Sequence, residues 1–324
     1  MDQDNNYPAL GVGLPPIGSL VPYSTVNARN PASKSILLSS AIEGHVLVSN
    51  ALPLKPPAAL SIFGYDAKGT DLYDPGFNLV WFLGLSSINA SEMGERMNAS
   101  LGITAPSVRS PAIARAGTLY TGGGSGSNTP AYISSLFEVL SQQAYADNTM
   151  LYWDFVDDPF DSAALGQQAL STLIGEEIPF TGPNVYQDSD ACLVFINAFA
   201  TESLDRPGFR DDYSDGLVIN IASQCNNTIV VIHNAGVHLV DQWADNPNIT
   251  AIIFAYLSGQ DLGRALVEVL YDKASPSRKL PYSVPKNESA YGNTLEPSMP
   301  KGQFVKYPQS NFTEGLYVDY RAFN

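Results

Sequence analysis

The chain has 324 residues, of which 44% are hydrophobic, so it can bury the core of one large domain or of two small ones. Its 32 acidic and 17 basic residues give a formal net charge of −15, which repels nucleic acid and anionic membrane surfaces, and we expect neither as a partner. No segment approaches the roughly 20 consecutive apolar residues of a membrane-spanning helix.

Residues 1–35 are predicted to be a connector, because they are rich in proline, serine and asparagine and contain Pro15-Pro16 and Asn30-Pro31, which oppose helix formation. The main domain is expected over residues 36–324, with an insertion near 66–115 and a loop-rich tail over 275–324. Its first elements are predicted from short apolar runs and helical spacing. They are a helix over 36–42, strands over 46–48, 59–64, 78–83 and 150–155, and helices over 132–146 and 163–174.

Three further apolar runs, at 191–196, 228–233 and 251–255, are too short for helices and rich in β-branched residues. Each precedes a stretch with apolar residues at helical spacing. Continuous apolar runs suit strands that are covered on both faces, so we predict a three-layer α/β/α sandwich around a mostly parallel sheet. In such sheets ligands bind beyond the carboxyl ends of the strands.

The segment after the first of these runs, FATESLDRP at 199–207, places two acids and a cation at such a carboxyl end. Arg206 beside Asp205 is most simply a charge pair that stabilises a loop. A loop glutamate is usually just solvated, so position alone leaves Glu202 either solvated or functional.

The TESLDRP segment resembles the T-E-[GS]-x-D-R-P motif of glycoside hydrolase family 3. Four more segments are similar to motifs of that family and occur in the same order and at the same spacing. They are AIEGHVLVSNALPL at 41–54, NNTIVVIHNAG at 226–236, SGQDLGRALVEVLY at 258–271 and NFTEGLYVDYR at 311–321. The resemblance covers nearly the whole chain and is to the C-terminal α/β sandwich domain of the fungal secreted members.

This resemblance implies that Glu202 is the general acid/base of a β-glucosidase that retains configuration. Such enzymes need a second carboxyl group about 5–5.5 Å away as the nucleophile. In the family that aspartate belongs to an S-D-W motif in an N-terminal barrel, which this sequence does not contain. Asp154, in WDF at 153–155, is only superficially similar to this motif, and we do not assign it the role of nucleophile. Ser203 and Leu204 depart from the glycine and aromatic residue common in the family.

Two interpretations therefore stay open. In the first, the chain is the acid/base domain of a β-glucosidase that breaks down terminal β-D-glucosides such as cellobiose, is inactive alone, and needs a family 3 barrel as its partner. In the second, it is a non-catalytic carbohydrate-binding or remnant domain. Sugar binding without turnover would favour the second. Neither interpretation involves a cofactor.

A glycine-rich segment, GGGSGSN at 122–128, precedes the helix expected over 132–146. Glycine-rich turns at helix starts can hold phosphate, but no lysine follows the glycines and the spacing is not G-x-G-x-x-G. The resemblance instead places Ser125 and Gly126 in a turn near the sugar pocket, where Asp205 and Arg206 also help to bind substrate or shape the loop. A plain flexible turn is the alternative.

The three histidines do not form a recognisable metal or hydrolase motif. His233 and His238 fall on a strand end and an incoming helix, without an H-E-x-x-H pattern or a cysteine pair. No G-x-S-x-G elbow is present either. We expect structural roles for these two residues and for His45, and no metal.

The compartment is inferred from cysteines and glycosylation signals. The N-terminal residues lack the apolar core of a signal peptide, whereas six N-x-[ST] triplets fit an exported, glycosylated parent enzyme. Cys192 opens one predicted strand and Cys225 lies just before the next, which places both at the same edge of the sheet. They can form a disulfide if the strands are neighbours, or remain two buried thiols. The six acceptor asparagines are Asn89, Asn98, Asn226, Asn248, Asn287 and Asn311.

Overall fold

The structure is a computed structural model of the chain. It separates into two compact units, Met1–Leu37 and Leu38–Asn324, and the sheet belongs to the second. The structure describes residues 29–49, 52–69, 113–114, 117–122, 130–155, 183–200, 206, 208–295, 301–307, 309, 311–317 and 319–322.

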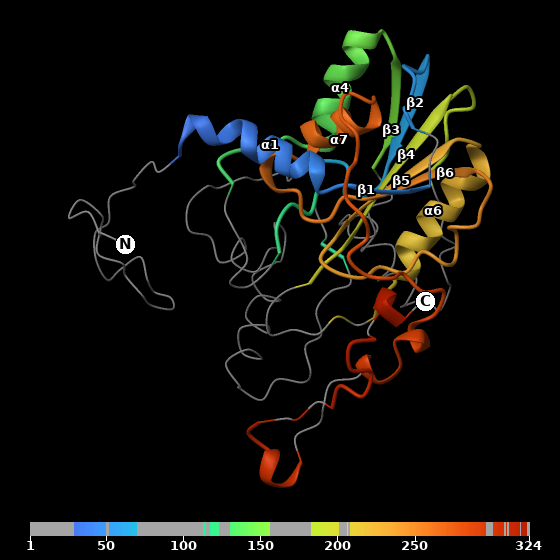
Figure 1. Ribbon diagram of the computed structural model, residues 1–324. Coiled ribbons are helices and arrows are strands. Elements are labelled where there is room, and N and C mark those ends of the chain that lie inside the picture. The colour runs from blue at the N-terminus through green and yellow to red at the C-terminus, as the bar shows by residue number, and fades with distance from the viewer. Residues whose placement is uncertain are drawn as a thin grey trace, which may run out of the picture. The chain divides into compact units, whose positions relative to one another are not determined.

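A six-stranded sheet forms the centre of the second unit, with strand order β1-β6-β5-β4-β2-β3 (Figure 1). Its five strands from β6 to β3 are parallel, and β1 pairs antiparallel with β6 at one edge. The predicted mostly parallel sheet is therefore confirmed. The strands are β1 (Val46–Ser49), β2 (Ala59–Phe63), β3 (Met150–Asp154), β4 (Ala191–Ala198), β5 (Thr228–Asn234) and β6 (Ile249–Phe254).

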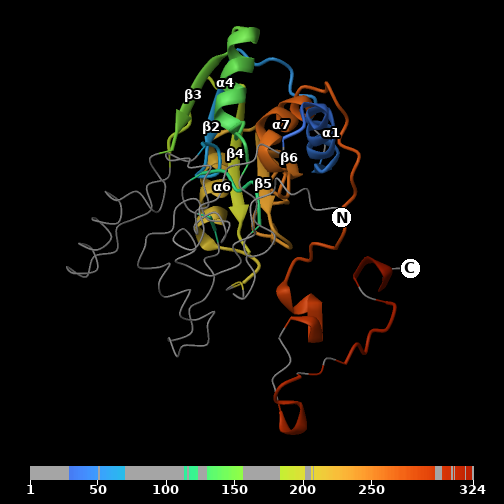
Figure 2. The ribbon, with the colours of Figure 1, turned by 90° about the vertical axis from the view of Figure 1, so that its left-hand side faces the viewer.

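Side chains of the central strands alternate between two apolar layers. On β4, Leu193 and Phe195 pack into the layer that contains the apolar residues of α4 (Leu136–Asp147) and α7 (Leu262–Leu270). Cys192 and Val194 point to the other layer, which α6 (Asp212–Gln224) covers. Figures 1 and 2 show α4 and α7 on one face of the sheet and α6 on the other. This arrangement is the expected three-layer α/β/α sandwich.

The ends of the helices are set by local capping. Ser135 caps α4 by accepting a hydrogen bond from the Glu138 amide over 3.3 Å, and the Ser134 amide donates to Gln260 O over 2.8 Å. The helix predicted over 132–146 therefore begins only at Leu136, because these two serines are engaged outside it. At Gly263 a β-carbon would lie 2.5 Å from Ser134 O, so only glycine lets α7 approach this turn so closely.

The helix expected after the second apolar run is not formed, and that prediction was wrong. Residues 235–248 contain turns instead, so His238 does not lie on a helix. Gly236 near the start of this segment has φ +123°, and Trp243, 1% exposed, packs into the apolar layer that α6 covers. The apolar residues of this segment are spaced as in a helix, but they belong to turns. Their spacing reflects which side chains are buried and does not require a helix.

The remaining elements are short. Over the described residues of 275–324 the structure has only 3-10 helices. The strand predicted at 78–83 and the helix predicted at 163–174 lie outside the described residues. The other helices are η2 (Pro31–Ser33), α1 (Lys34–Glu43), η4 (Gly259–Asp261), η5 (Glu288–Thr294), η6 (Gly302–Phe304) and η7 (Asp319–Ala322).

Candidate active site

Three buried polar residues meet at the carboxyl ends of neighbouring strands. Asp66 follows β2, Asn197 lies near the end of β4, and His233 near the end of β5. All three are 0% exposed. Because β2, β4 and β5 are adjacent and parallel, their carboxyl ends meet at one edge, where ligands of such sheets bind.

The carboxylate of Asp66 is the centre of this group. Its Oδ2 lies 2.5 Å from His233 Nδ1, and its Oδ1 accepts from Asn197 Nδ2 over 2.7 Å and from the Leu119 amide over 2.8 Å. Burial raises the pKa of Asp66, while His233 and these hydrogen bonds oppose the rise. Asp66 is therefore a fully enclosed carboxyl group whose two oxygens are both in use.

The conformation of the backbone at Gly64 places Asp66 at the carboxyl end of the sheet. Gly64 has φ +99°, and a β-carbon there would lie 2.1 Å from Phe195 O, so the turn after β2 passes against β4. The next residue, Tyr65, accepts a hydrogen bond from the Asn197 amide over 2.9 Å and donates to Asn197 O over 3.1 Å. The turn after β2 and the end of β4 are thus held together by the hydrogen bonds of Tyr65 and Asp66 to Asn197.

Arg206 lies near the end of the predicted acid/base segment and is anchored to the turn after β5. Its Nη1 donates to Val237 O over 2.5 Å, and its guanidinium carbon lies 5.6 Å from the centre of the Phe209 ring. Burial lowers the pKa of Arg206, and the nearby Tyr282, Asp211 and Glu288 oppose this shift. The contacts that the structure describes for Arg206 thus hold it to a backbone carbonyl and an aromatic ring.

Most residues of the predicted site lie outside the described part of the chain. This holds for Glu202, Asp205, Ser125 and Gly126, so the Asp205–Arg206 charge pair stays a prediction. The segments that flank them are described on both sides: residues up to 200 and from 206 for the first loop, and up to 122 and from 130 for the second.

The two other histidines are buried. Burial and the neighbouring Arg206 and Arg210 lower the pKa of His238 to about 3. Burial lowers the pKa of His45 to about 4, and its Nδ1 lies 2.7 Å from Ala41 O. Both rings are neutral near pH 7, as expected of structural residues. Among the described residues, no three or more His, Cys, Asp or Glu side chains gather as metal ligands, and no helix is long and apolar enough to cross a membrane.

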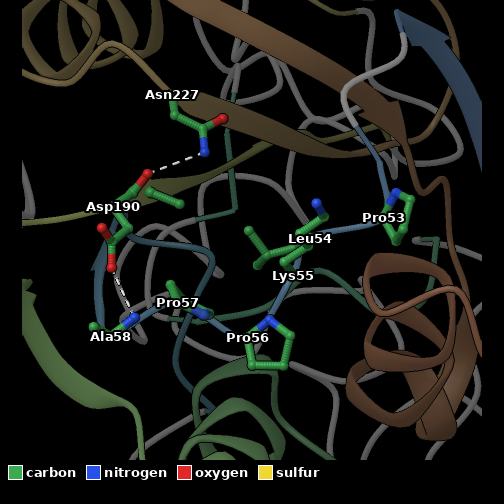
Figure 3. Close-up of a pocket in the computed structure, with 9 residues that line it drawn as sticks. Pro53, Leu54, Lys55, Pro56, Pro57, Ala58, Asp190 and Asn227 are labelled. Carbon is green, nitrogen blue, oxygen red and sulfur yellow. Dashed lines mark hydrogen bonds between the residues drawn. The ribbon is translucent and has the colours of Figure 1, made fainter.

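The opposite edge of the sheet holds the cysteines and a hollow of about 460 Å³. Cys192 and Cys225 form a disulfide at the amino ends of β4 and β5. In the hollow, Asp190 Oδ2 accepts from the Ala58 amide over 2.7 Å (Figure 3). It also accepts from the Ala59 amide over 3.0 Å. This hollow lies before the strands begin, whereas Asp66 lies where they end. Its lining residues are Pro53, Leu54, Lys55, Pro56, Pro57, Ala58, Asp190, Ala191 and Asn227.

The predicted glycosylation signals differ in their surroundings. Asn226, Asn287 and Asn311 are exposed, whereas the Nδ2 atom of Asn248 donates to Ala222 O over 2.7 Å near the end of α6. Glycosylation modifies this same nitrogen, so a glycan at Asn248 would require loss of the hydrogen bond to Ala222. Asn89 and Asn98 lie outside the described residues.

Comparison with known proteins identifies the family of this domain. Residues 45–320 match the glycosyl hydrolase family 3 C-terminal domain. A probable β-glucosidase M of Aspergillus flavus is 45% identical over 327 residues, which is 100% of this chain and 36% of that protein. β-Glucosidase cel3A of Pyricularia oryzae is 42% identical over 99% of this chain and 38% of that protein. The chain thus spans little more than a third of these relatives.

Solved structures give the same assignment. A family 3 β-glucosidase from Neurospora crassa superposes with a TM-score of 0.64 and 28% identity, over 94% of this chain and 32% of that one. The family match and the shared fold therefore define a glycoside hydrolase domain of the α/β sandwich type. The chain belongs to glycosyl hydrolase family 3 and corresponds to its C-terminal domain.

Sequence reasoning did not identify Asp66 and Asn197 as members of the edge. Both had a usable signal, because each is a polar residue at the end of a predicted strand in a parallel sheet. His233 was interpreted as structural, and its contact with Asp66 was not foreseen.

Proposed function

We propose that this chain is the acid/base domain of a β-glucosidase and that Glu202 protonates the departing glycosidic oxygen. Retention of configuration then requires a nucleophilic carboxylate from elsewhere, and a family 3 barrel is the expected source. The substrate is a terminal β-D-glucoside, such as cellobiose released during polysaccharide degradation. The parent enzyme is secreted and glycosylated.

The observation that carries this proposal is the family membership together with the TESLDRP segment at the end of β4. The acid needs a pKa raised by a closed, poorly solvated site so that it stays protonated near neutral or mildly acidic pH. Arg206, anchored to Val237 O, supports the downstream end of this segment. The family relatives carry names of β-glucosidases, which supports the substrate class.

The proposal can be tested in a chimera in which all 324 residues replace the matching segment of the Pyricularia oryzae β-glucosidase cel3A. The folded chimera should hydrolyse cellobiose. Glu202→Ala should lower kcat by about 10²–10⁴-fold for cellobiose, because proton assistance to the poor leaving group is lost. Glu138→Ala, at an exposed position of α4, is the matched control and should leave the rate unchanged.

Added azide should restore turnover of activated aryl glucosides by Glu202→Ala, because it attacks the glycosyl-enzyme without needing a general base. Equal cellobiose hydrolysis by Glu202→Ala and the parent chimera would refute the acid/base assignment. A folded chimera that binds glucosides without turnover would support the non-catalytic alternative instead.

A further inference from the structure

We propose that Asp66 is a positioning residue of this reaction: its buried carboxylate holds the stems of both loops that the family resemblance assigns to the sugar pocket. The inference rests on the proposed function and adds to it a residue that no motif of the family resemblance singled out. Asp66 itself follows β2, and its described contacts include the segments that lead into these loops. It acts through the segments that lead into them.

The first stem is the end of β4. Asn197 precedes Glu202 by five residues, and its Nδ2 donates to Asp66 Oδ1 over 2.7 Å. The carbonyl oxygen of the same side chain accepts from the Ala114 amide over 2.8 Å. The Asn197 side chain is bonded at both its oxygen and its nitrogen, so it has one orientation. The direction of the backbone at the end of β4, which leads into the Glu202 segment, therefore depends on Asp66.

The second stem is the segment 118–122, which leads into the glycine-rich loop. The Leu119 amide donates to Asp66 Oδ1 over 2.8 Å, and Thr118 Oγ1 donates to the backbone oxygen of Asp66 over 2.7 Å. Ser125 follows Leu119 by six residues. One residue therefore fixes the entry to both loops, and His233 Nδ1 at 2.5 Å fixes the carboxylate itself.

This arrangement needs a carboxylate for a chemical reason. Asp66 presents two acceptor oxygens to three donors, and a buried acceptor group with all its bonds made is held rigidly. An asparagine would keep one acceptor oxygen but turn a donating amide group toward His233. His233 Nδ1 could then bond to this amide group only as an acceptor, which requires the tautomer that carries its proton on Nε2. Asp66→Asn thus preserves size and most contacts while it weakens the hold on the two stems.

The experiment uses the chimera described above and compares Asp66→Asn with Asp190→Asn. Asp190 is the control, because its carboxylate also secures a loop by hydrogen bonds, here from the Ala58 and Ala59 amides, but at the opposite end of the strands. Asp66→Asn should lower kcat for cellobiose by about 10–100-fold while KM changes by less than about threefold, because misplacement of an acid by about 1 Å has effects of this size. Asp190→Asn should leave kcat unchanged.

The leaving group separates positioning from general loss of structure. Hydrolysis of 2,4-dinitrophenyl β-glucoside needs little proton assistance, so Asp66→Asn should lose much less there than on cellobiose. Asn197→Ala removes the bond between Asp66 and the β4 stem, together with the bonds to Ala114, and leaves the Leu119 bond in place. It should show the same bias if Asp66→Asn proves too unstable to purify. Unfolding temperatures of all variants report the folded fraction.

Unchanged kcat for Asp66→Asn, or equal losses on both substrates, would overturn the inference. Loss of activity in Glu202→Ala with full activity in Asp66→Asn and Asn197→Ala would refute only this inference. An inactive folded chimera, or an unaffected Glu202→Ala, would refute the proposed function and this inference with it.

Discussion

Trp243 Nε1 donates a hydrogen bond to Asp215 Oδ1 over 2.8 Å, which ties the turn segment between β5 and β6 to the first part of α6. Both residues are buried. Burial raises the pKa of Asp215 to about 6, although the Trp243 bond and Arg210 oppose the rise, and Asp211 and Asp241 add to it. An ionised carboxylate in this place costs folding free energy.

The sign of the pH dependence follows from this raised pKa. Folded protein keeps the Asp215 proton up to about pH 6, whereas unfolded protein releases it near pH 4. The contribution of Asp215 to the free energy of unfolding is therefore fully present below about pH 4 and is lost as pH rises through 6. Asp215→Asn keeps an acceptor for Trp243 and should gain about 1 kcal/mol relative to the parent between about pH 4.5 and pH 7. Thermal unfolding at both pH values tests this, and an unchanged difference between the two proteins would contradict it.

The disulfide between Cys192 and Cys225 closes a loop with a sequence separation of 33. Loss of such a cross-link frees the unfolded chain, so Cys192→Ala/Cys225→Ala should lower the free energy of unfolding by about 2–4 kcal/mol. Urea unfolding of secreted protein measures the change. Two free thiols per chain, titrated in denaturant without reductant, would show that the bond is not made.

Gly64 and Gly216 form a contrasting pair of substitution sites. Gly64→Ala forces a side chain into a left-handed conformation and against Phe195 O at 2.1 Å, so it should destabilise the fold by more than about 2 kcal/mol. Gly216 lies in α6, and a β-carbon added there would meet nothing within 4 Å, so Gly216→Ala should stabilise by about 0.5–1 kcal/mol. Equal stability of the two variants in urea would be inconsistent with this turn geometry.

The sheet was predictable because its central strands are continuous apolar runs. β4 was expected to end at 196, because the polar Asn197 resembles the end of a strand. The strand extends to Ala198, because Asp66 accepts a hydrogen bond from the buried Asn197 side chain. The turn segment after β5 was mistaken for a helix, because Leu239 and Trp243 are spaced like the buried face of one.

The polar edge could be predicted only in part. Asp66 bonds to Asn197 and His233 across sequence separations of 131 and 167 residues, and local periodicity carries no information on such pairs. The position of each residue at a strand end was readable, but not which donors would meet which carboxylate. Glu202 was proposed from its motif, which is a pattern of neighbours along the chain, and its role stays a prediction.

The glycosylation signals should differ in use. Asn287 and Asn226 are exposed and should carry glycans in protein secreted from a fungal host, whereas a glycan at Asn248 would break the bond from its Nδ2 to Ala222 O. Peptide mass analysis before and after glycan removal measures occupancy. High occupancy at Asn248 with an unchanged unfolding temperature would contradict the expected difference, and Asn248→Gln should lower stability by about 1 kcal/mol through the lost hydrogen bond.

The 324-residue chain alone should not hydrolyse p-nitrophenyl β-glucoside. Retaining hydrolysis requires a second carboxyl group about 5–5.5 Å from the acid, and without it no glycosyl-enzyme can form. We expect no such role for Asp154, which ends β3, the edge strand beyond β2. Purified chain should therefore show no turnover above that of its Glu202→Ala variant, while the chimera with a barrel is active. Turnover that persists through purification and disappears in both Glu202→Ala and Asp154→Asn would mean that Asp154 supplies the nucleophile after all.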